Sequence, residues 1–282
     1  MEYRIVNHPA AKIREVARTA LAGSWKDVVL FMFLYYLMTD GVGMVLDLFF
    51  STTQIVPIED PLTGEYVQQT VGYGSGIYSL LISGPAAWGL SKYMLDFFRN
   101  KKTEITTLFE GFSYFGKAFV LLILMGVKIF LWTLLFIVPG IIATFRYSQA
   151  FYILIDHPEY SANQCLKESS QMMKGNKWKL FCLELSFVGW IILASIPAGI
   201  ISGLSLGISG GIGGIILTII MAIPTLFVDA YFNVAATVFY ELAADNLVIM
   251  EAGQSLPEER WEDSSAAKSP WDDAPEDDSD RG

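Results

Sequence analysis

Six apolar segments, separated by short polar stretches, follow one another along the chain. A helix rises 1.5 Å per residue, so about 20 apolar residues cross the ~30 Å hydrocarbon core of a bilayer. The segments cover residues 27–50, 72–97, 117–138, 140–156, 179–203 and 212–240. This pattern predicts an all-α, polytopic membrane protein with six transmembrane helices.

The third and fourth segments meet at Val138-Pro139-Gly140, where we expect the turn of a helical hairpin. The fourth segment is short, but its residues still extend ~25 Å as a helix. The alternative is one long bent helix over 117–156. Such a helix would exceed the bilayer thickness about twofold, which favours the hairpin.

Lys and Arg residues predict how the segments are oriented, because they are enriched in cytoplasmic loops. Basic stretches precede the first segment and follow the second and the fourth. They alternate with stretches 51–71, the Pro139 turn and 203–214, which carry no basic residue. We therefore expect both termini in the cytoplasm, no cleavable signal peptide, a location in the cytoplasmic membrane, and Trp178 as an interfacial anchor. The basic residues before the first segment are Arg4, Lys12, Arg14, Arg18 and Lys26.

Three polar segments beside the membrane have amphipathic helical periodicity. They lie within 1–26, around 105–112, and over 161–175, where Ser161 and Gln164 have the spacing of a capping box. Such helices lie flat in the membrane interface or pack their apolar face against the ends of the spans. The sequence leaves both arrangements open.

The composition agrees with a membrane protein and identifies a separate tail. Only 17% of the residues are charged, whereas soluble domains carry about 25%. Residues 253–282 hold ten acidic and three basic residues, so they account for seven of the ten net negative charges. We divide the chain into a cytoplasmic amphipathic helix (1–26), a membrane domain (27–250) and a disordered acidic tail (251–282). In the tail, Trp261 and Trp271 are candidates for docking a cytosolic protein; a purely solubilising role is the alternative.

Four ionisable residues are predicted to lie deep in the membrane, where each is costly. Counted from the cytoplasmic boundary, Asp40 lies ~22 Å deep, Lys128 ~17 Å, Arg146 ~15 Å and Asp229 ~18 Å. Pairing of Arg146 with Asp229 and of Lys128 with Asp40 is the simplest arrangement. These residues are either structural ion pairs or the lining of a polar pathway or headgroup site.

A second, shallower set of charges consists of Lys92 and Glu184, each ~9–11 Å deep. The chain also contains a weak internal similarity. Aligning Pro139 with Pro224 also matches Asp156 with Glu241. A true repeat, as found in many transporters, and a coincidence of common membrane residues are both open.

No catalytic or metal-binding motif stands out. The chain has two histidines and two cysteines, and we expect Cys165 and Cys182 to be unpaired thiols. The metalloprotease, nucleophile-elbow and P-loop motifs are absent. We expect no enzymatic activity, no catalytic residue, no metal and no cofactor, and membrane lipids rather than nucleic acid as partners.

Several stretches resemble a known family. LFEGFSYF, LWTLLFIVPGIIATFRYSQAFYILIDHP, SSQMMKGNKWKLFCLELSFVGW and VFYEL are similar to a bacterial, mainly Gram-positive, integral membrane family of unknown function. That family is related to the membrane domain of some glycerophosphodiester phosphodiesterases. The resemblance implies a six-helix membrane domain and no established activity. The first functional hypothesis is a non-catalytic protein that is transporter-like or interacts with lipids or small solutes. The alternative is a membrane scaffold that recruits a cytosolic partner through its tail.

Overall fold

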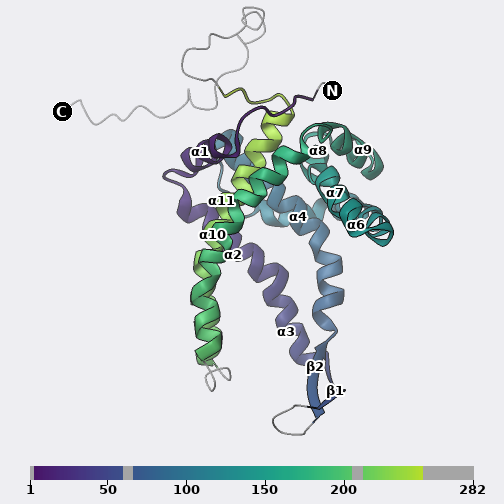
Figure 1. Ribbon diagram of the computed structural model, residues 1–282, viewed down its shortest axis with the longest axis vertical. Coiled ribbons are helices and arrows are strands. Elements are labelled where there is room, and N and C mark those ends of the chain that lie inside the picture. The colour runs from purple at the N-terminus through teal and green to yellow at the C-terminus, as the bar shows by residue number, and fades with distance from the viewer. Residues whose placement is uncertain (1–2, 60–65, 205–211, 250–282) are drawn as a thin grey trace, which may run out of the picture.

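Long helices form most of the molecule, which we describe from a computed structural model covering residues 3–59, 66–204 and 212–249 (Figure 1). The helices α1, α8 and α9 lie at one end. From there α2 with α3, α4, α10 and α11 extend to the opposite end, where the strands β1 and β2 lie. In chain order the helices are α1 (Ala10–Leu21), α2 (Trp25–Tyr36), α3 (Val42–Phe49), α4 (Gly74–Asn100), α5 (Thr107–Glu110), α6 (Phe115–Leu135), α7 (Ile137–Tyr147), α8 (Ala150–Asp156), α9 (Ala162–Met172), α10 (Lys177–Leu204) and α11 (Ile212–Ala243).

The first apolar segment forms a continuous helical path that ends in an unpredicted β-hairpin. A π-helical turn, Leu37–Gly41, joins α2 to α3. Strands β1 (Ser51–Glu59) and β2 (Tyr66–Gly72) then pair antiparallel. We expected a plain loop over 51–71, and this expectation was wrong. Both strands contain β-branched residues in the runs STTQIV and YVQQTV, which favour extended backbone.

Helix α4 is central to the packing, because it contacts α3, α5, α6, α8 and α11. Glycines make the closest of these contacts possible. A Cβ at Gly89 would lie 2.7 Å from the Leu108 carbonyl oxygen, and a Cβ at Gly111 would collide with the carbonyl of Pro85. A 3-10 turn, Gly111–Tyr114, therefore fits directly against α4.

Helices α6 and α7 form the predicted hairpin, with the turn slightly earlier than expected. The chain leaves helical geometry at Phe136 (φ −160°, ψ 152°), before Pro139. The predicted fourth span is interrupted after Tyr147, so α7 has 11 residues and extends about 16 Å. In Figure 1, α6 and α7 end well above the lower ends of α4 and α10. The same view shows α6 and α7 running obliquely to α10 and to the lower part of α4.

Two of the three amphipathic segments bury their apolar face against other helices. In α1, Ile13, Ala17 and Leu21 are buried, and the helix contacts α10 and α11. In α9, Cys165 and Leu166 are also buried, and the helix contacts α6, α7 and α8. The capping box of α9 is confirmed by the reciprocal bonds between Ser161 and Gln164. The third segment is mixed, because Leu108 is buried whereas Ile105, Phe109 and Phe112 are exposed.

Four helical segments of the described ranges have the length and composition of membrane spans: Trp25–Asp47, Thr107–Leu135, Lys177–Ile196 and Ile223–Ala243. They correspond to four of the six predicted segments. Helix α4 is not among them; its second half holds Lys92, Asp96 and Arg99. The described residues thus form an all-α molecule with four helices that are long and apolar enough to span a membrane, together with one small β-hairpin. The full set of six spans stays a prediction.

Candidate functional site

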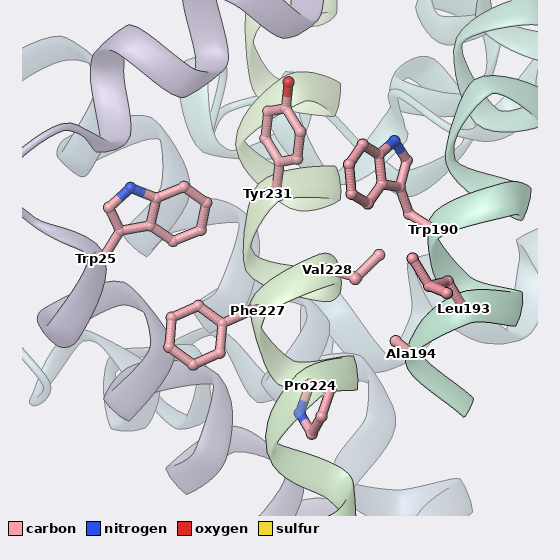
Figure 2. Close-up of a pocket in the computed structure, with 8 residues that line it drawn as sticks. All are labelled: Trp25, Trp190, Leu193, Ala194, Pro224, Phe227, Val228 and Tyr231. Atoms are coloured by element: carbon pink, nitrogen blue, oxygen red, sulfur yellow. The ribbon is translucent and has the colours of Figure 1, made fainter. Parts of the chain in front are cut away.

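An apolar pocket of about 650 Å³ lies between α2, α10 and α11 (Figure 2). Its size is in the range of pockets that hold small ligands. All of its lining residues belong to three of the four candidate spans. They are Trp25 from α2, then Trp190, Leu193 and Ala194 from α10, and Pro224, Phe227, Val228 and Tyr231 from α11.

Helical periodicity brings these side chains together. The lining positions of α10, and likewise those of α11, are separated by one, three or four residues, which places them on one side of each helix. The sequence analysis missed this stripe because apolar residues also occupy most other positions of both segments. Pro224 further distinguishes α11, because its ring nitrogen cannot donate to the helical hydrogen-bond ladder.

Aromatic rings frame one end of the pocket. The Trp25 ring lies 5.9 Å from the Phe227 ring and 6.2 Å from the Tyr231 ring, between centroids. Figure 2 shows Trp25 and Trp190 on opposite sides of Tyr231, with Pro224 at the other end. Trp190 is half-exposed. Trp and Tyr side chains gathered in this way are typical of the boundary between headgroups and hydrocarbon.

The aromatic end of the pocket is joined to α1 by polar contacts. The Tyr231 hydroxyl donates to the backbone carbonyl of Arg14 over 2.8 Å. The Arg14 guanidinium in turn donates from Nη1 to the Ser186 carbonyl of α10 over 3.4 Å. Helix α1 therefore lies across α10 and α11 beside this end of the pocket.

The two cations of the predicted mid-membrane layer contact α9 instead of acidic residues. Lys128 donates to Oδ1 of Asn163 over 2.7 Å, and Nε of Arg146 donates to Oγ of Ser170 over 2.6 Å. Both side chains thus reach a polar helix that the sequence places outside the membrane. The inclination of α6 and α7 explains this, because counting residues along a helix gives depth only when the helix is perpendicular to the membrane.

The two anions of that layer also have other partners. Asp229 accepts a hydrogen bond of 3.0 Å from the Tyr36 hydroxyl. Asp40 is exposed within the π-helical turn and accepts from Thr39 over 3.1 Å. The expected pairs Arg146–Asp229 and Lys128–Asp40 are therefore not those of the structure, which does not bring the four residues together.

The remaining predicted residues are also separate. Lys92 pairs with Asp96, one turn further along α4, over 2.7 Å. Glu184 is half-buried in α10 and does not pair with Lys92. Trp261 and Trp271 lie outside the described residues, so docking through the tail stays a prediction.

The sequence analysis missed an ionic network at the end of the molecule where α1 and α9 lie. Arg99 donates to both carboxylate oxygens of Asp156 over 2.7 and 2.8 Å, and from Nε to Glu241 over 2.7 Å. The Tyr240 hydroxyl also donates to Asp156 over 2.7 Å. Burial disfavours the charge on Arg99, but these carboxylates outweigh it and raise the pKa of the guanidinium. The network joins α4, α8 and α11, and borders a cleft of about 490 Å³.

The residues matched by the internal alignment meet at this network. Asp156 and Glu241 bind the same arginine, and the same offset pairs Tyr152 with Thr237, whose hydroxyl oxygens are 3.2 Å apart. The ends of α8 and α11 thus contribute equivalent positions around α4. The contacts agree with either alternative, a true repeat or a coincidence of common membrane residues.

Metal-binding groups are not gathered in the described ranges. Within them, no three or more His, Cys, Asp or Glu residues are placed to hold an ion, and both cysteines are free thiols. Burial raises the pKa of the Cys165 thiol to about 11, which keeps it protonated and weakly nucleophilic.

The sequence matches one protein family. The matches cover residues 8–144 and 136–246, which together are most of the chain, and the family is described as a protein of unknown function (DUF975). No curated protein and no solved structure matches the chain. The family match agrees with the resemblance in the sequence, whereas a relation to phosphodiesterase membrane domains stays a prediction. The chain belongs to the DUF975 family.

Proposed function

We propose that this protein is a non-catalytic, multi-pass membrane protein that binds an acyl chain of a membrane lipid in the pocket between α2, α10 and α11. The observation that carries the proposal is the pocket of about 650 Å³, lined by apolar side chains from three candidate spans. A concave apolar site with few polar groups is the usual form of a small-molecule site.

The character of the pocket favours hydrocarbon over a polar solute. The polar groups of its described lining residues are the indole N–H groups of Trp25 and Trp190 and the Tyr231 hydroxyl, which already donates to the Arg14 carbonyl. Water gains little in an apolar cavity, because it needs two to four polar partners. At the depth of the candidate spans, lipid chains are the surrounding medium, so an acyl chain is the occupant with the shortest path to the site.

The pocket supports binding more directly than catalysis. Among the lining residues that the structure describes, Tyr231 is the one with an ionisable side chain, and the others offer no nucleophile, acid or base. General acid–base chemistry needs such groups within hydrogen-bonding distance of the reacting atoms. A polar transport pathway through the membrane would likewise need the four charged residues to line a common space, and these have separate partners.

We place both termini of the protein in the cytoplasm. The amide of Arg4 donates to the Ala243 carbonyl over 3.0 Å, and the hydroxyl of Tyr3 donates to Glu168 of α9 over 2.8 Å. The start of the chain, α9 and the end of α11 therefore lie on one side, opposite the β-hairpin (Figure 1). The basic stretches belong to this side, and basic residues are enriched in cytoplasmic loops.

Filling the pocket is the direct test. Ala194 is 8% exposed and lines the pocket, so Ala194→Phe places a ring where the acyl chain would lie. We expect at least a tenfold loss of lipid retained by the purified protein, measured by native mass spectrometry after detergent exchange. Tenfold corresponds to about 1.4 kcal/mol, less than full burial of a few methylene groups contributes.

The matched control is Val127→Phe, which adds a ring at a half-exposed position of α6, away from the pocket. We expect it to retain lipid as the unaltered protein does. Equal retention by Ala194→Phe and Val127→Phe, with both proteins folded by circular dichroism, would refute the proposed function.

A further inference from the structure

We infer that Arg14 and Arg18 bind the phosphate of an anionic lipid whose acyl chain occupies the pocket. This inference rests on the proposed function and specifies its ligand class. The two arginines are one helical turn apart on α1, so their side chains are neighbours on the helix surface. The ligand would lie with its chain among Trp190, Leu193 and Val228 and its phosphate beside α1.

The position of Arg14 fits this role. Its backbone carbonyl accepts from the Tyr231 hydroxyl, at the aromatic end of the pocket, and its Nη1 donates to the Ser186 carbonyl, one turn before Trp190. Both Arg14 and Arg18 are close enough to Tyr231 to interact with its hydroxyl electrostatically. Two positive charges therefore lie next to the aromatic end of the pocket. Trp and Tyr residues are enriched at the headgroup level of a membrane, so this end is the one expected there.

Among the described residues, no acidic side chain neutralises the charges of these two arginines. Within residues 3–59, 66–204 and 212–249, neither Arg14 nor Arg18 forms a salt bridge, whereas Arg4 pairs with Asp245 and Lys12 with Glu15. Nε of Arg14 is buried and has no hydrogen-bond partner in the same ranges. The one bond of its guanidinium, to Ser186, is long at 3.4 Å.

An anionic phosphate supplies the negative charge that the described residues do not place beside these arginines. A guanidinium presents its donors in a planar fork that matches two phosphate oxygens, and the charge makes these bonds stronger than neutral ones. A zwitterionic phosphocholine headgroup carries the same phosphate together with a quaternary ammonium, which two arginines repel. We therefore expect a preference of roughly tenfold or more for an anionic over a zwitterionic headgroup.

The test compares two lipids with identical acyl chains, phosphatidylglycerol and phosphatidylcholine. The full chain is incubated with equal amounts of both in detergent, and the bound ratio is measured by native mass spectrometry. The unaltered protein should prefer phosphatidylglycerol roughly tenfold or more. The double variant Arg14→Gln/Arg18→Gln should bind both lipids with a ratio within about threefold of one. The double variant keeps the backbone contact of Arg14 with Tyr231 but loses the long bond from Nη1 to the Ser186 carbonyl, so retention of phosphatidylcholine by this variant checks that the pocket is intact.

The matched control, Lys102→Gln/Lys174→Gln, removes the same net charge from two exposed lysines outside α1 and should keep the preference. Adding inorganic phosphate at millimolar concentration should leave the bound ratio unchanged, because the acyl chain supplies most of the affinity. Loss of the preference in the lysine control, its persistence in the arginine variant, or full competition by inorganic phosphate would each overturn the inference. Failure of the proposed function is distinct, because neither lipid would then be retained.

Discussion

Replacing Arg99 with alanine should lower the free energy of unfolding by about 3 kcal/mol. Removal of one partner from a buried ion pair costs about 3–5 kcal/mol, because the remaining charge stays buried without compensation. We expect a cost at the lower end of this range because the Arg99 side chain is 33% exposed. The Glu241 side chain, in contrast, is only 4% exposed, so its charge would stay buried. The substitution leaves both Asp156 and Glu241 without their cation, and it removes the ion pairs that join α4 to α8 and α11.

Thermal unfolding in detergent, followed by circular dichroism, measures this effect. The control is Lys92→Ala, which removes an i,i+4 pair with Asp96 on the same helix and should cost about 0.5 kcal/mol. The triple variant Arg99→Ala/Asp156→Asn/Glu241→Gln should recover part of the loss, because no carboxylate is then left unpaired. Equal stability of Arg99→Ala and Lys92→Ala would show that the network does not hold these helices together.

Replacing Gly111 with alanine should have a similarly large effect, for a steric reason. The added Cβ would collide with the backbone carbonyl of Pro85, which cannot rotate away as a side chain can. Forcing extra atoms into a packed contact typically costs about 1–3 kcal/mol, and a clash with backbone belongs at the upper end. The segment from Leu108 to Gly111 would have to move away from α4.

Gly126→Ala is the matched control, because a Cβ at that position of α6 meets nothing within 4 Å. Alanine has the higher helix propensity, so this variant should be neutral or slightly stabilising. Chemical unfolding of both variants in mixed micelles gives the comparison. If Gly111→Ala were as stable as Gly126→Ala, the protein would not have the close contact between α4 and the 3-10 turn.

Much of the helical architecture is predictable from the sequence, because a run of apolar residues is local information. Each of the apolar segments is helical in the structure, and the hairpin turn at Phe136 lies close to the predicted Pro139. The capping box at Ser161 is equally local. The β-hairpin was missed because its β-branched runs lie between helices that dominate the pattern.

The partners of charged residues depend on how helices are inclined and which of them are neighbours. Depth counting placed Lys128 and Arg146 in the membrane centre, but the inclination of α6 and α7 brings both side chains to α9. Arg99, Asp156 and Glu241 were treated as boundary charges, although they converge from three helices. Nothing in one segment of sequence indicates that another segment packs against it.

The apolar pocket was missed for a different reason than the partners of the charged residues. Its lining residues have a clear helical spacing, but in a membrane segment an apolar stripe has little contrast with the rest of the helix. This stripe differs from the rest of the helix because Trp190 of α10 and Val228 of α11 line the same pocket. That arrangement is visible only in the tertiary structure. The same holds for α1, because only the structure shows that its arginines lie beside that pocket.

Photo-crosslinking with a phospholipid that carries a diazirine in its acyl chain tests the central claim most directly. After irradiation in vesicles, labelled peptides are identified by mass spectrometry. If the acyl chain occupies the pocket, labels should concentrate on the α10 peptide with Leu193 and Ala194 and on the α11 peptide with Val228, and they should be lost in Ala194→Phe. Labels spread evenly over exposed apolar residues such as Leu134 of α6, with no change in that variant, would contradict it.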